Sequence, residues 1–245
     1  MGLALAGYAP GTINLTLAAM RGLLRHCRKL RLLAPDDFED LREVRRVRSR
    51  GSIAGRALDR EEIEHLFGAA GALPHPLRER DLALLAISFS AGARRAEIAA
   101  LNLDDYGRDR PAVRIRSGKG GRDRLAFLTR GATIHIDAWI EVRGSDAGPL
   151  LNPVSSHGWI QRGRLSATTV YERFRQLAAA AGIGHVTPHD ARRTVATSML
   201  RAGIDVNVVA RQTGHASLDV LRGSYDRRGD DVVSQAVRDA IVVPA

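Results

Sequence analysis

Apolar residues recur at spacings of three and four along most of this chain, a pattern that places them on one face of an α-helix. Ile13, Leu17 and Leu24 show the pattern near the start of the sequence. Proline, glycine and N-capping residues interrupt it at short intervals, as they do at helix ends. The predicted helices are 12–33, 35–47, 78–89, 95–101, 133–143, 167–181, 188–202, 206–213, 218–228 and 231–243. A further helix is expected after the capping pair Asp59 and Glu62.

Two short segments, 112–116 and 124–128, read as strands instead. The glycine-rich stretch Ser117–Gly121 between them predicts a tight antiparallel hairpin. The expected fold class is therefore mainly α (α+β): a multi-helical domain with a small antiparallel β-sheet, preceded by a short helical N-terminal piece.

The stretch 45–52 is basic, polar and flanked by glycine, and we interpret it as a linker. The predicted domains are a helical piece over 1–48, a linker over 49–57 and a main domain over 58–245.

The charge balance limits the partners. Lys and Arg number 37 against 27 Asp and Glu, which gives a net charge of +10 and indicates a polyanion such as nucleic acid. A basic surface without a special partner is the alternative. The single cysteine, Cys27, excludes a disulfide framework and fits a reducing cytoplasm. The apolar run 82–93 is too short to cross a bilayer, so we expect no membrane partner.

Polar residues of the types that bind phosphates or carry out catalysis stand at two predicted helix starts. His189 and Arg192 are three residues apart, so they share a helix face near the N-terminus, a place suited to a phosphate. Arg94 follows a helix break, and Glu97 is placed to orient an arginine. The alternative for the first pair is a solvated polar face, and the alternative for the second is two surface arginines with an i, i+3 ion pair.

Three more residues stand at turns or helix ends. Lys119 is one of two lysines in the chain and occupies the tip of the predicted hairpin. A lysine beside phosphates can act as a general acid when neighbouring cations lower its pKa. Gly214 is a natural residue to end the helix 206–213, His215 follows it, and Tyr225 lies in the next segment. A solvated turn and a packed tyrosine are the alternatives.

In this order, Arg94, Lys119, His189-x-x-Arg192, Gly214-His215 and Tyr225 resemble the active-site signature of the tyrosine recombinase (phage integrase) family. The resemblance covers roughly residues 56–230 and includes Pro188-His189-Asp190-x-Arg192-Arg193-Thr194. It implies a catalytic domain over 58–245. For 1–48 it implies a shortened core-binding domain, the part that clamps DNA in this family.

The resemblance also implies the chemistry. The protein would be a site-specific DNA recombinase or integrase that cleaves and rejoins DNA through a 3′-phosphotyrosyl intermediate, without metal, ATP or another cofactor. Tyr225 would be the nucleophile and Lys119 the proton donor to the leaving oxygen. Glu97 would support the site. The phosphate would be held by Arg94, Arg192, His189 and His215.

The implied partners are double-stranded DNA and further copies of the chain, as a dimer on a site and a tetramer in synapsis. The expected DNA-contacting residues are Arg21, Arg25, Arg28, Lys29, Arg48, Arg50 and Arg193. The expected location is cytoplasmic and nucleoid-associated, in a bacterium or encoded by a phage.

Two features depart from the family pattern. Tyr225 follows His215 by ten residues, one more than is usual in the family, and the N-terminal piece is short. The sequence therefore leaves two alternatives open. One is a non-catalytic or truncated DNA-binding remnant of the family, and the other is a type IB topoisomerase-like activity.

Overall fold

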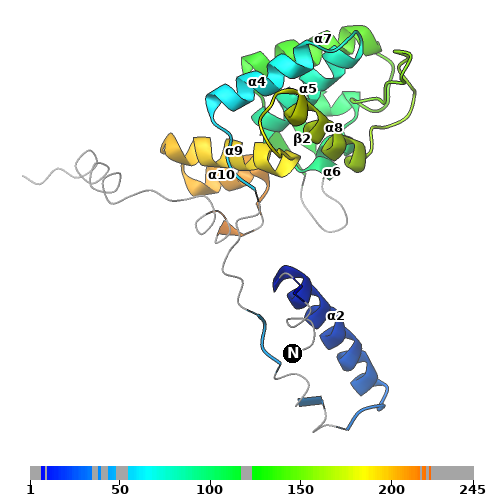
Figure 1. The fold of residues 1–245 in the computed structure, drawn as a ribbon, viewed down its shortest axis with the longest axis vertical. Coiled ribbons are helices and arrows are strands. Elements are labelled where there is room, and N and C mark those ends of the chain that lie inside the picture. Colours follow the sequence, from blue (N-terminus) through cyan, green and yellow to red (C-terminus); the bar gives the residue numbers. More distant parts are fainter. Residues whose placement is uncertain are drawn as a thin grey trace, which may run out of the picture. The chain divides into compact units, whose positions relative to one another are not determined.

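The computed structural model of the 245-residue chain describes residues 7–8, 10–34, 38–39, 44–47, 55–116, 123–215, 217–218 and 221. The chain forms two compact units, 1–54 and 55–245 (Figure 1). The functional division of the sequence into 1–48, 49–57 and 58–245 stays a prediction.

The N-terminal unit contains helix α2 (Pro10–Lys29). The predicted end at residue 33 is wrong, because Arg31 adopts a left-handed conformation with φ 58°. The Leu32 N–H then turns back and donates to the Cys27 carbonyl at 2.9 Å, which closes the helix. The predicted second helix is also wrong over 44–47, where the Asn14 side-chain amide bonds both the N–H and the carbonyl of Val47 at 2.9 Å.

The C-terminal unit is mainly helical and confirms the predicted fold class. Its elements, in chain order, are α4 (Arg60–Gly71), α5 (Leu77–Ala91), α6 (Arg95–Ala100), η1 (Leu103–Asp105), β1 (Tyr106–Gly107), β2 (Ala112–Ile115), β3 (Arg124–Phe127), α7 (Arg130–Arg143), α8 (Ala167–Ala180), α9 (Pro188–Arg201) and α10 (Val206–Thr213). The predicted capping box of Asp59 and Glu62 is present at the start of α4.

Helix α5 runs through the centre of this unit and packs against α4, α7 and α9 (Figure 1). Its residues Leu84, Leu85 and Ile87 are fully buried. Trp139 of α7 and Phe174 of α8 complete the same core, and the Trp139 indole donates to the Leu150 carbonyl at 2.7 Å. A helix enclosed in this way is a rigid support for the residues at its C-terminal end.

The sheet is antiparallel with strand order β1–β2–β3. The two predicted strands are confirmed, and β1 is an addition that the sequence pattern did not reveal. Val113 pairs with Ala126 on the buried face, and Ile115 pairs with Arg124. This register places Arg124 at the start of β3.

Helices α9 and α10 lie side by side (Figure 1) and share a small apolar cluster that includes Leu200 and Val209. The N-terminus of α9 and the C-terminus of α10 carry the residues discussed below. Of the predicted helix 218–228 the structure describes only residues 218 and 221, and the predicted helix 231–243 lies outside the described residues.

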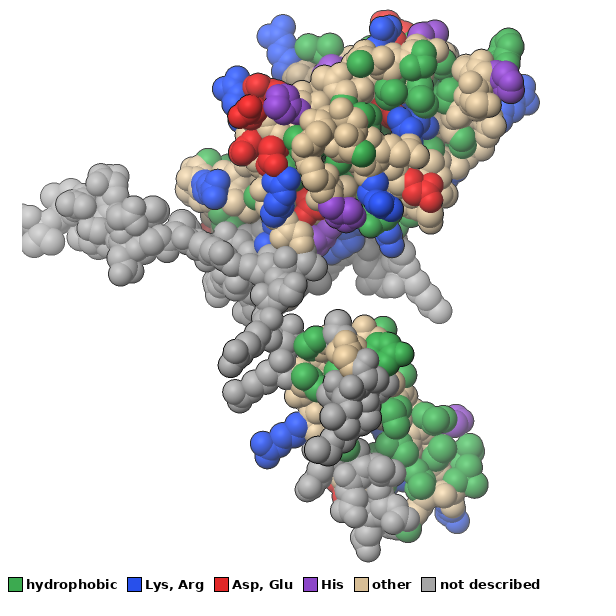
Figure 2. All heavy atoms as spheres, viewed as in Figure 1, with side chains coloured by type: hydrophobic (Ala, Val, Ile, Leu, Met, Phe, Trp, Pro, Cys, Tyr) green, Lys and Arg blue, Asp and Glu red, His purple; other side chains and the backbone are tan. Residues whose placement is uncertain are grey.

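No helix among the described residues is long and apolar enough to cross a membrane. Figure 2 shows acidic and basic side chains mixed over the visible face of the C-terminal unit. The net positive charge is therefore not spread there as one unbroken basic surface.

Candidate active site

Arg94 stands where α5 gives way to α6. Gly92 ends α5 in the left-handed conformation, with φ 59°. A Cβ at Gly92 would lie 3.0 Å from the Thr213 Cγ2 atom, so glycine also permits the close approach of α10. Arg94 then caps α6: its N–H donates to the Glu97 carboxylate at 2.8 Å, and its Nη1 donates to the same carboxylate at 2.8 Å.

His189 and Arg192 lie in the first turns of α9, as predicted. Thr187 is the N-cap, Pro188 occupies the first turn, and the Asp190 carboxylate accepts from the Thr187 N–H at 2.8 Å. Arg192 is only 2% exposed. Its Nη1 donates to the Gly92 carbonyl at 3.0 Å and also to the Thr213 carbonyl.

His215 lies just beyond α10, which ends at Gly214 with φ 72°. The Gly214 and His215 N–H groups both donate to the Ala210 carbonyl, at 2.7 and 3.1 Å. The His215 Nδ1 atom is 2.7 Å from the Thr213 Oγ1 atom. Because Thr213 Oγ1 also lies 2.6 Å from the Val209 carbonyl, the imidazole is tied to the last turn of the helix.

Three guanidinium groups meet at this end of α10. Arg192 and Arg124 donate to the Thr213 carbonyl, and Arg94 donates to the Gly214 carbonyl at 2.7 Å. The last carbonyls of a helix lack intrahelical donors and carry partial negative charge, so they attract cations. Arginines from three separate elements are gathered around one short stretch of backbone for this reason.

A cavity of about 350 Å³ opens between α6, α8 and the start of α9. Its lining residues are Arg94, Arg95, Ala96, Tyr171, Thr187, Pro188, His189 and Arg192. The cavity is large enough for a phosphate group, and its walls supply two arginines and a histidine from the predicted set. Planar guanidinium groups bind phosphate oxygens in pairs of hydrogen bonds.

Both histidines are shifted toward their neutral form. Partial burial lowers the pKa of His189, and the guanidinium groups of Arg193 and Arg192 lower it further. Burial lowers the pKa of His215 to about 4, with additional effects from Arg192 and Arg94. At neutral pH the positive charge of the site therefore resides on the arginines.

This shift predicts a pH-dependent stability. Unfolding returns His215 from a pKa of about 4 to an ordinary value near 6.5, so the unfolded chain binds more protons between these values and stability falls as the pH drops through them. Allowing for the partial exposure of the ring, we expect wild type to lose about 1–2 kcal/mol more than His215→Gln over this range. Urea unfolding at both ends of the range measures the difference; equal losses would contradict it.

The predicted site residues divide into those that the structure describes and those that lie outside it. Lys119, Tyr225, Arg48 and Arg50 lie outside the described residues. Arg193 is described and is 8% exposed on α9. The structure thus brings together five of the predicted residues: Arg94, Glu97, His189, Arg192 and His215.

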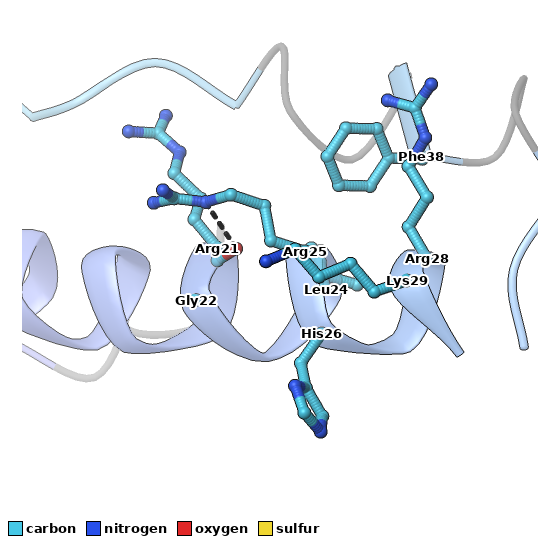
Figure 3. Close-up of a pocket in the computed structure, with 8 residues that line it drawn as sticks. All are labelled: Arg21, Gly22, Leu24, Arg25, His26, Arg28, Lys29 and Phe38. Atoms are coloured by element: carbon cyan, nitrogen blue, oxygen red, sulfur yellow. Dashed lines mark hydrogen bonds between the residues drawn. The ribbon is translucent and has the colours of Figure 1, made fainter. Parts of the chain in front are cut away.

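The four basic residues predicted on α2 line a second cavity, within the N-terminal unit, of about 840 Å³ (Figure 3). The Arg28 guanidinium lies over the Phe38 ring, 4.7 Å from its centre. Arg25 Nε donates to the Arg21 carbonyl at 3.3 Å, and Arg21 itself donates to the Val44 carbonyl. Figure 3 shows His26 pointing away from these side chains. A DNA-binding role for Arg21, Arg25, Arg28 and Lys29 remains a prediction.

Arg124 is the residue that the sequence analysis missed. It was recognised only as the start of a strand, yet its side chain reaches both Glu97 and the end of α10. The available signal is that Arg124 begins the first predicted strand after the glycine-rich stretch 117–121. Among the described residues, no group of three or more His, Cys, Asp or Glu side chains is arranged to hold a metal ion.

The fold and this site together define a class. A helical domain with a three-stranded sheet, in which Arg94, His189 and Arg192 line one cavity, fits the tyrosine-type site-specific DNA recombinases. Residues 56–229 match the model of the phage integrase family. The chain belongs to this family.

Individual relatives agree with this assignment. The chain is 29% identical over 216 residues to the tyrosine recombinase XerA of Thermococcus kodakarensis, covering 88% of this chain and 71% of that one. It is 35% identical over 215 residues to the tyrosine recombinase XerD of Mycobacterium tuberculosis, covering 82% and 65%. The fold resembles that of the Tn1549 transposon integrase in complex with a circular intermediate DNA, with a TM-score of 0.75 and 14% identity over 97% of this chain and 82% of that one.

Proposed function

We propose that this protein cleaves and rejoins double-stranded DNA at specific sites through a 3′-phosphotyrosyl intermediate. The observation that carries the proposal is the convergence of Arg94, Arg192, His189 and His215 at the end of α10 and around the neighbouring cavity. Such a set of donors stabilises the charge that develops on a phosphate during transfer.

Each residue has a role in the proposed reaction. The Tyr225 oxygen attacks the phosphorus and the bond to the 5′ oxygen breaks, while Lys119 gives that oxygen a proton. Arg94 and Arg192 bind the non-bridging oxygens. His215 and His189 are neutral in the free protein, so each can hydrogen-bond the phosphate, and His189 can accept the tyrosine proton. A 5′-hydroxyl from another strand then reverses the attack, so bond energy is conserved.

The proposal extends to the partners. Duplex DNA is the substrate, and the basic residues on α2, in the linker and at Arg193 contact its phosphates. Two copies occupy one site and four take part in synapsis, because the exchange of strands requires four cleavages. A protein that acts on chromosomal DNA in this way is expected at the nucleoid.

The test of the proposed function is formation of a covalent adduct. A half-site is selected from a random-sequence duplex pool by binding to this chain. A series of duplexes of this half-site is then prepared, in which a single nick is placed at each successive nucleotide. Cleavage near the nick releases a short strand that diffuses away, which traps the phosphotyrosyl protein. We expect a DNA-linked band on a denaturing gel; binding to the half-site with no adduct at any nick position would contradict the proposal.

Cleavage is expected to need no divalent metal, because the arginines supply the positive charge, and the arginines and histidines supply the donors, that a metal ion would otherwise provide. Adduct formation on the selected half-site should proceed at the same rate in excess EDTA as in magnesium. A magnesium-dependent nuclease assayed in parallel tubes of the same buffers confirms that the chelator is effective. Loss of the adduct in EDTA and its recovery on adding magnesium would show that the proposed mechanism is wrong.

A further inference from the structure

Arg124 occupies a place that the proposed reaction does not use. Its side chain is only 16% exposed and lies between β3, α6 and the end of α10. Nη1 donates to one Glu97 oxygen at 3.1 Å and Nη2 donates to the other at 2.8 Å. Nη2 also donates to the Thr213 carbonyl at 3.1 Å. One planar group therefore joins three elements that are distant in sequence.

Each partner of Arg124 holds a residue of the phosphate site. The Glu97 carboxylate also accepts from the side chain and the N–H of Arg94. Thr213 holds His215 through its hydroxyl group, and its carbonyl also accepts from Arg192. Arg124 is thus connected to Arg94 through Glu97, and to His215 through Thr213.

The electrostatics of Glu97 agree with this arrangement. Burial acts to raise the pKa of Glu97, but hydrogen bonds from Arg124 and from the Arg94 N–H outweigh it, and the net pKa is lowered. Glu97 is therefore an anion, shared by two guanidinium groups. Removing Arg124 leaves this carboxylate with Arg94 alone.

The fit between Arg124 and the loop is tight. A Cβ built on Gly214 would lie 2.4 Å from the Arg124 Cζ atom, far inside a van der Waals contact. Gly214 therefore lies against the Arg124 guanidinium group, with no room for a side chain between them. Gly203 provides a comparison, because its φ of 76° is close to the 72° of Gly214 but a Cβ there meets nothing within 4 Å.

We propose that Arg124 is a positioning residue, which holds Arg94 through Glu97 and holds His215 through the Thr213–Gly214 backbone, so that both face the scissile phosphate. This inference rests on the proposed function. Arginine is required because an ammonium group cannot present two parallel N–H bonds to a carboxylate and also reach a carbonyl in the same plane.

A double-mutant cycle tests the route through Glu97. We expect Arg124→Gln to slow adduct formation on the selected half-site about 10- to 100-fold, the scale of a small misplacement of reacting groups. Half-site affinity should change by less than about threefold, since Arg124 touches no DNA in this scheme. When Glu97→Gln is already present, adding Arg124→Gln should slow adduct formation by less than about a further threefold, because the two residues act as one unit.

The controls separate positioning from charge and from general stability. Arg114→Gln removes an exposed arginine from the neighbouring strand β2 and should leave the rate unchanged. Arg124→Lys keeps the charge but should remain closer to Arg124→Gln than to wild type. The proposal would be overturned if the rate losses of Arg124→Gln and Glu97→Gln multiply in the double variant. It would also be overturned if Arg124→Gln lowers only the half-site affinity, or if Arg124→Lys restores the full wild-type rate.

A second pair of variants tests the contact with the loop. Gly214→Ala should slow adduct formation much more than Gly203→Ala, because only the first methyl group meets Arg124. Placed in an Arg124→Ala background, Gly214→Ala should add little. Equal effects of the two glycine substitutions, or an undiminished effect without Arg124, would contradict the packing argument.

NMR of the histidine side chains tests the positioning without DNA. Arg124→Gln should shift the His215 imidazole signals of the free protein, while Arg114→Gln should not. If wild type forms no adduct, the proposed function fails and these signals still decide the role of Arg124. Unchanged His215 signals in Arg124→Gln would overturn the inference, even if the wild-type protein cleaves DNA.

Discussion

Replacing Tyr225 by phenylalanine is expected to abolish the covalent DNA adduct completely. The substitution removes only the hydroxyl group that is proposed to attack the phosphorus, so no slower route to the same adduct remains. Half-site affinity should stay within about twofold of wild type, because many phosphate contacts dominate binding and one hydroxyl adds little. A denaturing gel measures the adduct, and a mobility shift on the same duplex measures binding.

Tyr171 is the matched control for this variant, since among the described residues it is the tyrosine that lines the cavity. Its hydroxyl lies 3.3 Å from the His185 Nε2 atom, and the Arg95 guanidinium lies 5.7 Å from its ring centre. Tyr171→Phe should still form the adduct. Mapping of the phosphotyrosine to Tyr171, or an adduct from Tyr225→Phe, would show that the nucleophile has been assigned wrongly.

Replacing Arg192 by alanine should have the second-largest effect. The loss of one preorganised donor to a developing negative charge typically costs on the order of 10²–10³ in rate, and we expect a loss of that size in adduct formation. The variant should also be less stable than wild type, because the buried carbonyls of Gly92 and Thr213 lose a donor. Single-turnover adduct kinetics and thermal unfolding measure the two effects separately.

Arg201 supplies a control for the charge and for the helix. It lies in the last turn of α9 and is exposed. Arg201→Ala should therefore leave both the rate and the stability nearly unchanged. If Arg192→Ala is no slower than Arg201→Ala, the guanidinium group of Arg192 does not contact the reacting phosphate.

The sequence was most informative where local rules decide the structure. The bounds of α10 and the start of α9 follow from Asp205, Gly214 and Pro188, because caps act on residues within one turn. The two errors in the N-terminal unit arose where a local pattern was overridden. The left-handed conformation of Arg31 ends α2 before the predicted residue 33. The Asn14 side-chain amide forms hydrogen bonds with the N–H and carbonyl of Val47, in place of the helical hydrogen bonds that were predicted there.

The order of Arg94, His189, Arg192 and His215 along the chain likewise predicts that these residues form one site, and the structure places them around the end of α10 and the neighbouring cavity. The order could not show how they are held. Arg124 is the clearest case, since its partners Glu97 and Thr213 are 27 and 89 residues away in sequence. Periodicity and capping carry no signal over such separations.

By itself, the sequence determined most of the helices and strands of the C-terminal unit and the family signature, because each of these depends on neighbouring residues or on chain order. Only the tertiary structure decided that Arg94, Arg124 and Arg192 all meet at the end of α10. These residues are 120, 89 and 21 positions from their carbonyl partners. Packing of the C-terminal unit around α5 brings them together, and the partial negative charge of the last helical carbonyls holds them there.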